Sequence, residues 1–297
     1  MPIQKAKEMG TLYVVSTPIG NLEDITLRAL RILKEVDLIA AEGVEHSKGL
    51  CRHYGIRTKL VSCHQHNQKT RVPELLGKLR AGLDIAMITD AGTPGVSDPG
   101  VQLMGQALME GIPMSPIPGP SAVTAALSVS GMRGDRFLFL GFLSNRPGKR
   151  RKTLEKLRHE PYTLVFLEAP HRLKATVKDI LEILGDRQMV LLRELTKVYE
   201  EIIRNRVSAI LDHVSQGPVR GEITLIVEES QEGPPESRLT QEGRRKMEVL
   251  LQEGRMSLKD AAAQISHEEG ISYRRAYKAC LALKKEKNES RCQRRPL

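Results

Sequence analysis

The chain has 297 residues, of which 40% are hydrophobic and 28% are charged, a composition typical of globular proteins. Lysine and arginine number 46 against 36 aspartates and glutamates, and the resulting net charge of +10 favours a polyanionic partner such as nucleic acid. Aromatic residues make up 3% of the chain and tryptophan is absent, which excludes base stacking on aromatic side chains as the main mode of nucleic-acid binding.

The first part of the chain alternates short apolar runs with segments of helical periodicity. Strands are predicted over residues 11–16, 37–41, 59–62, 85–89 and 113–117. Helices are predicted after an Asp24 cap and over residues 47–54, 73–80 and 101–109, with Asp98 as the N-cap of the last. Strands separated by helices of this length predict a mostly parallel sheet with helices on both faces.

A dense run of proline and glycine at residues 116–120 predicts a boundary between two α/β domains, residues 10–118 and 119–230. The second domain is expected to contain strands at 137–141, 163–167, 189–193 and 222–228, an extended segment at 199–204, and helices at 122–130, 150–158, 171–184 and 208–214. After a linker at 230–237, residues 238–287 predict a small helical module similar to a helix-turn-helix, followed by a frayed basic tail from residue 284.

The segment that follows the predicted strand at 85–89 is the strongest candidate for a ligand site. Asp90 stands at the carboxyl end of this strand, and small residues follow it in the run AGTPG. Ligands of open α/β sheets bind at the carboxyl ends of strands. The chain contains neither G-x-G-x-x-G nor a P-loop, which argues against a ligand held by its phosphates.

Charged residues also cluster at strand ends of the second predicted domain. Glu168 is followed by His171 and Arg172, and Glu194 by Lys197, while Glu222 precedes the last strand. Three such clusters in one domain favour a shared cleft. Residues 146–158 carry seven basic residues against one glutamate, a run that favours contact with a phosphate backbone. The histidines and cysteines of residues 46–66 lack the spacings of a zinc site, so no metal is predicted.

Several of these segments together match a known family. They are TPIGNL with DIT at residues 17–26, TDAGTP with DPG at 89–100, PGP with SA at 118–122, E-x-PHR at 168–172, RELTK at 193–197 and GE at 221–222. Over residues 12–228 the chain resembles the ribosomal RNA branch of the tetrapyrrole methylase superfamily. The resemblance implies two α/β domains with S-adenosylmethionine in the cleft between them, a homodimer, and methylation of a ribose 2′-hydroxyl of a cytidine in the decoding region of 16S rRNA.

The resemblance also implies site residues. Those expected to bind the cofactor are Pro18, Asp90, Ala91, Gly92, Thr93, Val96, Ser121, Ala122, Leu167 and Thr224, with Asp90 accepting a hydrogen bond from the cofactor's polar end. The candidates for activating the ribose hydroxyl are Glu168, Glu194, Lys197 and Glu222. Contact with RNA is expected from Lys149, Arg150, Arg151, His171 and Arg172.

The chain departs from the family at residues 41–46, which read AEGVEH where members generally have AEDTRH. One alternative function is methylation of a tetrapyrrole precursor, although such enzymes typically carry a glycine-rich loop where this chain has STPIGN. A second alternative is a DNA-binding regulator that uses the helical module, with the α/β portion sensing a ligand. The lack of a long apolar run or a signal peptide, and four scattered cysteines, favour a cytoplasmic protein.

Overall fold

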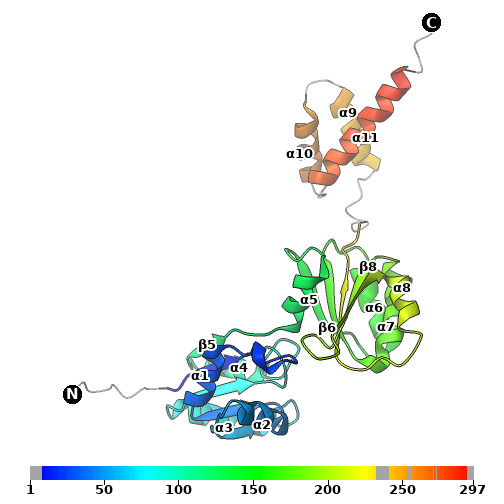
Figure 1. Ribbon diagram of the computed structural model, residues 1–297. Coiled ribbons are helices and arrows are strands. Elements are labelled where there is room, and N and C mark those ends of the chain that lie inside the picture. The colour runs from blue at the N-terminus through cyan, green and yellow to red at the C-terminus, as the bar shows by residue number, and fades with distance from the viewer. Residues whose placement is uncertain (1–8, 232–240, 253–255, 270, 272, 293–297) are drawn as a thin grey trace. The chain divides into compact units, whose positions relative to one another are not determined.

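The computed structural model describes residues 9–231, 241–252, 256–269, 271 and 273–292. The chain divides into two units, residues 1–153 with 162–228, and residues 154–161 with 229–297. The first unit contains two five-stranded sheets, which Figure 1 draws from blue to yellow, and the second contains the helices drawn in orange and red.

The first sheet is parallel throughout and has the order β3-β2-β4-β1-β5. Its strands are β1 (Leu12–Val15), β2 (Leu38–Ala41), β3 (Leu60–Ser62), β4 (Ile85–Ile88) and β5 (Met114–Ile117). Its helices are α1 (Leu27–Glu35), α2 (Val44–His53), α3 (Gln68–Arg80) and α4 (Val101–Met109), with a short 3₁₀ helix η1 (Leu22–Asp24) before α1. The predicted parallel α/β architecture is confirmed.

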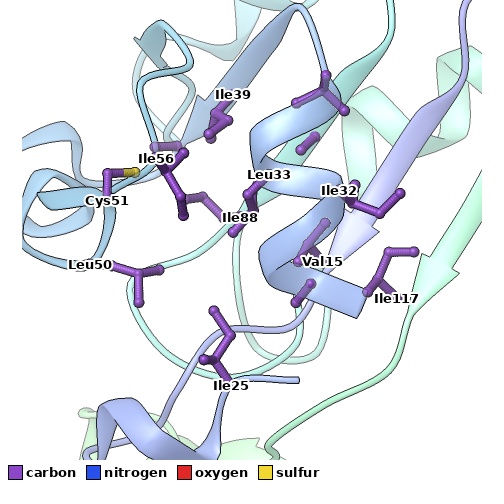
Figure 2. Packing of buried hydrophobic residues seen from close by; sticks show 14 residues of the cluster. Val15, Ile25, Ile32, Leu33, Ile39, Leu50, Cys51, Ile56, Ile88 and Ile117 are labelled. Carbon is purple, nitrogen blue, oxygen red and sulfur yellow. The ribbon is translucent and has the colours of Figure 1, made fainter. Parts of the chain in front are cut away.

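Two hydrophobic clusters cover the two faces of this sheet. On one face, Ile32 and Leu33 of α1 pack with Val15, Ile39 and Ile88 of the strands (Figure 2). On the other face, side chains of α3 and α4 pack against alternate residues of the same strands. Every residue of β2 and β4 is buried, which explains why these strands are continuous apolar runs.

The second sheet is mixed and has the order β6-β7-β10-β8-β9. The β6–β7 pair is parallel, and the pairs β7–β10, β10–β8 and β8–β9 are antiparallel. The strands are β6 (Phe137–Phe142), β7 (Thr163–Glu168), β8 (Gln188–Arg193), β9 (Glu201–Arg206) and β10 (Ile223–Val227). The helices are α5 (Ala122–Ser130), α6 (Pro147–Leu157), α7 (Pro170–Leu184) and α8 (Val207–His213). The strands of the first sheet end at residue 117, and those of the second begin at residue 137. Both sheets belong to one unit, so the domain boundary at residue 118 stays a prediction.

The second unit contains α9 (Gln241–Gln252), α10 (Leu258–Glu268) and α11 (Tyr273–Cys292). These helices pack around a core that includes Met247, Ile265 and Cys280. Helix α11 continues to Cys292, so the fraying expected from residue 284 is wrong for residues 284–292. Residues 293–297 of the tail and residues 232–237 of the predicted linker lie outside the described residues. Within the described residues, no helix is long and apolar enough to cross a bilayer.

Four helix starts differ from the predictions by more than one residue, one of them that of α6, which begins at Pro147 and not at residue 150. Asp24 does not cap α1, because Thr26 occupies the N-cap and its hydroxyl accepts a hydrogen bond from Ala29 N–H (3.1 Å). Helices α2 and α3 begin at Val44 and Gln68, before the predicted starts at residues 47 and 73. Neither has a side chain of its N-cap residue bonded to the first turn, so the usual local signal for a start is missing.

We expect Thr26→Ala to lower the free energy of unfolding by about 1 kcal/mol, the usual cost of losing an N-cap hydrogen bond. Asp24→Ala is the matched control and should change it by less than about 0.5 kcal/mol, because Asp24 caps no helix. Denaturant titration followed by circular dichroism measures both. Equal losses for the two variants would contradict the assignment of Thr26 as the cap.

Candidate active site

The loops that follow β1 and β4 are joined by backbone hydrogen bonds. Thr17 N–H donates to Gly92 O (2.9 Å), and Gly92 N–H donates to Thr17 O (3.1 Å). The Thr17 hydroxyl donates to Thr89 O (3.0 Å), and the hydroxyls of Ser16 and Thr93 lie 2.9 Å apart. Gly92 has φ +80°, a conformation that favours glycine. The two strand-end loops therefore form one ledge at the carboxyl edge of the first sheet.

A loop of the second sheet lies directly against this ledge. Asn21 N–H donates to the Thr196 hydroxyl (3.1 Å), 175 residues away in the chain. A Cβ atom at Gly20 would lie 2.5 Å from Lys197 Cγ and 2.9 Å from Leu195 O, so glycine is required for this approach. Glu194 and Thr196 have φ of +52° and +65°, which is uncommon for residues other than glycine. The loop after β8 is thus held in a strained form at the first sheet's edge.

A cavity of about 340 Å³ lies between the ledge and the second sheet. This volume is within the range of small-molecule sites, and the wall is mostly apolar. Of the ten residues predicted to bind a cofactor, eight line this cavity: Ala91, Gly92, Thr93, Val96, Ser121, Ala122, Leu167 and Thr224. The other two, Pro18 and Asp90, line a separate cavity beside α2.

Asp98 lies in the cavity wall, whereas the sequence predicts it to be the N-cap of a helix. The prediction that it caps a helix is wrong, because α4 begins at Val101 with Gly100 at its N-cap. Burial, together with the nearby carboxylates of Glu42 and Asp90, raises the pKa of Asp98 to about 7. Asp98 is therefore an acidic group in the cavity wall, with two further carboxylates near it: Asp90 from the same β4–α4 loop and Glu42 from the end of β2.

Asp90 is fixed by the start of α2. Gly43 N–H donates to Asp90 Oδ1 (3.0 Å), and Asp90 N–H donates to Glu42 Oε2 (3.3 Å). A Cβ atom at position 43 would lie 2.4 Å from Asp90 Oδ1. Gly43, one of the departures from the family pattern, therefore lets the Asp90 carboxylate reach the positive end of the α2 dipole.

Glu168 is buried at the end of β7 and fully engaged by protein groups. It accepts hydrogen bonds from the Thr176 hydroxyl (2.6 Å) and Ala169 N–H (2.7 Å), and it forms an ion pair with Arg172 (2.5 Å). Arg172 also donates to Leu143 O and lies over the Phe142 ring, 6.0 Å from its centroid. These contacts fix the start of α7 and the cavity wall at Phe142.

Glu194, Lys197 and Glu222 form a second charged cluster at the cavity. Lys197 Nζ lies 2.9 Å from Glu194 Oε1 and 3.3 Å from Glu222 Oε2, and Glu194 Oε1 also accepts from Glu222 N–H (2.8 Å). The hydrogen bond from Lys197 lowers the pKa of Glu194. Burial alone would lower the pKa of Lys197, but its bonds to Glu194 and Glu222 raise it above the usual value. Glu222, with 70% of its side chain exposed, lines the cavity.

The basic residues expected to contact RNA differ in their surroundings. Arg150 is 4% exposed and forms an ion pair with Asp179 (2.7 Å), and Arg151 bonds Asp179 and Glu182. These two arginines therefore join α6 to α7. Lys149 and His171 are exposed. The basic run in the sequence does not reveal that one of its arginines is buried.

Residues 11–211 match the family model described as Tetrapyrrole (Corrin/Porphyrin) Methylases. The chain belongs to this family. A protein of Pseudomonas aeruginosa named ribosomal RNA small subunit methyltransferase I is 42% identical over 275 residues, which cover 92% of this chain and 97% of that protein. A protein of the same name from Halalkalibacterium halodurans is 47% identical over 225 residues, covering 76% and 78%. The resemblance predicted from the motifs is confirmed.

Solved structures of the same fold have lower sequence identity. A uroporphyrin-III C-methyltransferase from Thermus thermophilus, complexed with S-adenosyl homocysteine, has a TM-score of 0.56 at 22% identity and covers 74% of this chain and 98% of its own. A cobalt precorrin-4 methyltransferase has a TM-score of 0.58 at 17% identity and covers 76% and 97%. These similarities confirm the predicted fold class.

The raised pKa of Asp98 makes stability depend on pH. Because the folded protein holds this proton up to about pH 7 and the unfolded chain releases it near 3.8, stability falls as pH rises between these values and is lowest above 7. We expect Asp98→Asn to be more stable than the parent at pH 8 and nearly equal at pH 4. Thermal melts at several pH values measure this, with Asp212→Asn, an exposed aspartate of α8, as control. Parallel curves for Asp98→Asn and the parent would contradict it.

Proposed function

We propose that this protein transfers a methyl group from S-adenosylmethionine to the ribose 2′-hydroxyl of a cytidine in the decoding region of 16S rRNA. The observation that carries the proposal is the cavity between the two sheets, which is apolar along most of its wall and has the carboxyl group of Asp98 in that wall. Relatives that are 42–47% identical and are named as ribosomal RNA small subunit methyltransferases support RNA as the substrate.

The charges at the cavity fit this cofactor. S-adenosylmethionine carries its methyl group on a positively charged sulfonium and has an ammonium group at its polar end. Asp98 lies in the wall with Glu42 and Asp90 close enough to raise its pKa, so a cationic ligand there relieves the repulsion among three carboxylates. The apolar wall, with Leu167 from β7 and Ala122 from α5, suits the remainder of the molecule.

The candidates for activating the ribose hydroxyl have different contacts, which assign them different roles. Glu168 and Glu194 are each bound by several protein donors and act by positioning Arg172 and the loop after β8. Glu222 is the exposed carboxylate on the cavity wall. We assign it as the base that accepts the hydroxyl proton while the ribose oxygen bonds the methyl carbon and the carbon–sulfur bond breaks. Lys197, held protonated, stabilises the negative charge that develops on the oxygen.

RNA contact is proposed for the exposed residues Lys149 and His171, and for Arg172 beside the cavity. Arg150 and Arg151 already neutralise carboxylates of α7, so we assign them to the protein's own structure. Contacts with phosphates make binding fall as salt rises. A homodimer and a cytoplasmic location belong to the same proposal, and sedimentation analysis of the purified protein tests the dimer.

The two alternative functions have less support. Methylation of a tetrapyrrole precursor rests on structures at 17–22% identity, a likeness that shows the fold alone. A DNA-binding regulator would use α9–α11 and sense a ligand in the cavity between the sheets, but the relatives named above are not named for DNA binding. Neither alternative accounts for relatives that match 92% of the chain and are named for ribosomal RNA.

The proposed reaction is tested by incubating the protein with labelled S-adenosylmethionine and 30S subunits that lack the modification. We expect label on one cytidine 2′-oxygen of 16S rRNA, mapped by nuclease digestion and mass spectrometry, and none in 50S subunits. Label on a base, or transfer to a tetrapyrrole and not to RNA, would overturn the proposal.

Glu222→Gln should lower the single-turnover rate of transfer by roughly 10²- to 10⁴-fold, the usual contribution of a general base. The affinity for S-adenosylhomocysteine should stay within about twofold, because the change is isosteric. Glu35→Gln is the control, since Glu35 is also an exposed carboxylate in an ion pair but lies on α1. A wild-type rate for Glu222→Gln would rule out Glu222 as the base.

A further inference from the structure

The three helices of the second unit, α9, α10 and α11, form what we call the helical module. None of its described residues lines the cavity between the sheets. The family model ends at residue 211, before the module begins. All three helices contribute to a hydrophobic core of the module's own. The proposed function therefore gives this part of the chain no role, and its role has to come from its own surface.

Positive charge is concentrated on one helix of the module. In its 20 residues, α11 carries seven lysines and arginines against two glutamates. In comparison, α9 carries three basic residues against two acidic ones, and α10 carries one against two. Half of the chain's net charge of +10 thus lies on α11. Such an uneven distribution of charge along a chain is typical of a segment that binds a polyanion.

Two lysines of α11 are open to an external anion. Lys278 lies midway between the buried residues Ala276 and Cys280, so it points away from the core of the module. Lys278 and Lys284 are both exposed, and no ion pair within the described residues involves either of them. On α9, by contrast, Lys246 Nζ lies 3.5 Å from a carboxylate oxygen of α10. The charges of the two α11 lysines are therefore not neutralised by carboxylates of the described chain.

An aromatic surface lies beside these lysines. The rings of Tyr273 and Tyr277 stack with centroids 6.0 Å apart and an interplanar angle of 23°. Tyr277 packs against the core of the module, whereas Tyr273 is 46% exposed. The spacing of four and seven residues puts Tyr273, Tyr277 and Lys284 on one side of the helix. Aromatic rings next to cations are typical of surfaces that hold unpaired nucleotides, because a base stacks on the ring and the cations bind its phosphates.

We propose that α11 binds a single-stranded segment of the substrate RNA, with phosphates at Lys278 and Lys284 and an unstacked base on the Tyr273 ring. The inference rests on the proposed function, since it takes this RNA to be the 16S rRNA of that reaction. The module then increases affinity for the small subunit and takes no part in methyl transfer, because none of its described residues lines the cavity. Duplex DNA offers phosphates to the lysines, but its bases stay stacked and leave Tyr273 without a partner.

Replacing both lysines tests the contacts with phosphates. We expect Lys278→Gln with Lys284→Gln to raise KM for 30S subunits roughly 10-fold and to leave kcat within about twofold, since binding is lost and chemistry is not. The slope of the logarithm of the binding constant against that of salt concentration should become less steep by about 2. The matched control is Lys246→Gln with Lys259→Gln, which removes the same charge from α9 and α10 and should change neither quantity.

Tyr273→Ala tests the stacking contact. We expect KM for 30S subunits to rise roughly 10-fold with an unchanged salt slope, because the stacking of one base is lost and no charge is removed. The variant should fold, since Tyr273 is 46% exposed. Calorimetry should give the parent's affinity for S-adenosylhomocysteine in every variant, because the cavity contains no described residue of the module.

The outcomes separate the inference from the proposed function. If the parent protein methylates 30S subunits and the α11 variants do so with the parent's KM, α11 does not bind the RNA and the proposed function stands. Equal effects of the two lysine pairs, a lower kcat at unchanged KM, or tighter binding of the parent to duplex DNA than to 30S subunits would also overturn the inference. A parent that binds 30S subunits but does not methylate them would overturn the proposed function, and the salt slopes would still test α11.

Discussion

The two hydrogen bonds between Thr17 and Gly92 are the contact on which the rest of the site depends. They join loops that begin at neighbouring parallel strands, β1 and β4, and fix which residues face which cavity. Parallel strands bring such loops to one edge of a sheet, but that arrangement does not by itself form hydrogen bonds between the loops. Without this bridge, the ledge against which Thr196 and Lys197 pack would consist of two independent loops, and the cavity would lose a wall.

The acidic end of the site is the second constraint. Glu42 follows β2, whereas Asp90 and Asp98 share the loop between β4 and α4, and the mutual repulsion of the three carboxylates is costly without a cation. Asp90 is partly stabilised by the start of α2, which requires the small residue at position 43. The departure from the family pattern at Gly43 therefore has a physical consequence in this chain, since it sets how closely the Asp90 carboxylate approaches α2.

Much of the fold could be predicted from the sequence because its strongest signals are local. Buried strands such as β4 are continuous apolar runs, and the family motifs lie at strand ends, so the fold followed, and eight of the ten residues predicted to bind a cofactor line one cavity. The division between the two cavities could not be predicted, because Pro18 and Ile19 are neighbours in sequence but face different sides of a loop. Arg150 was also misleading, since a basic run does not show which arginine meets a buried aspartate 29 residues away.

The central claim is that the cofactor occupies the cavity between the sheets and not the separate cavity beside α2. Hydrogen–deuterium exchange with and without S-adenosylhomocysteine tests it most directly. The account predicts slower exchange in residues 91–98, 121–123 and 221–224, which line the cavity, and no change in α2. Slower exchange along α2, with residues 121–123 and 221–224 unchanged, would contradict it.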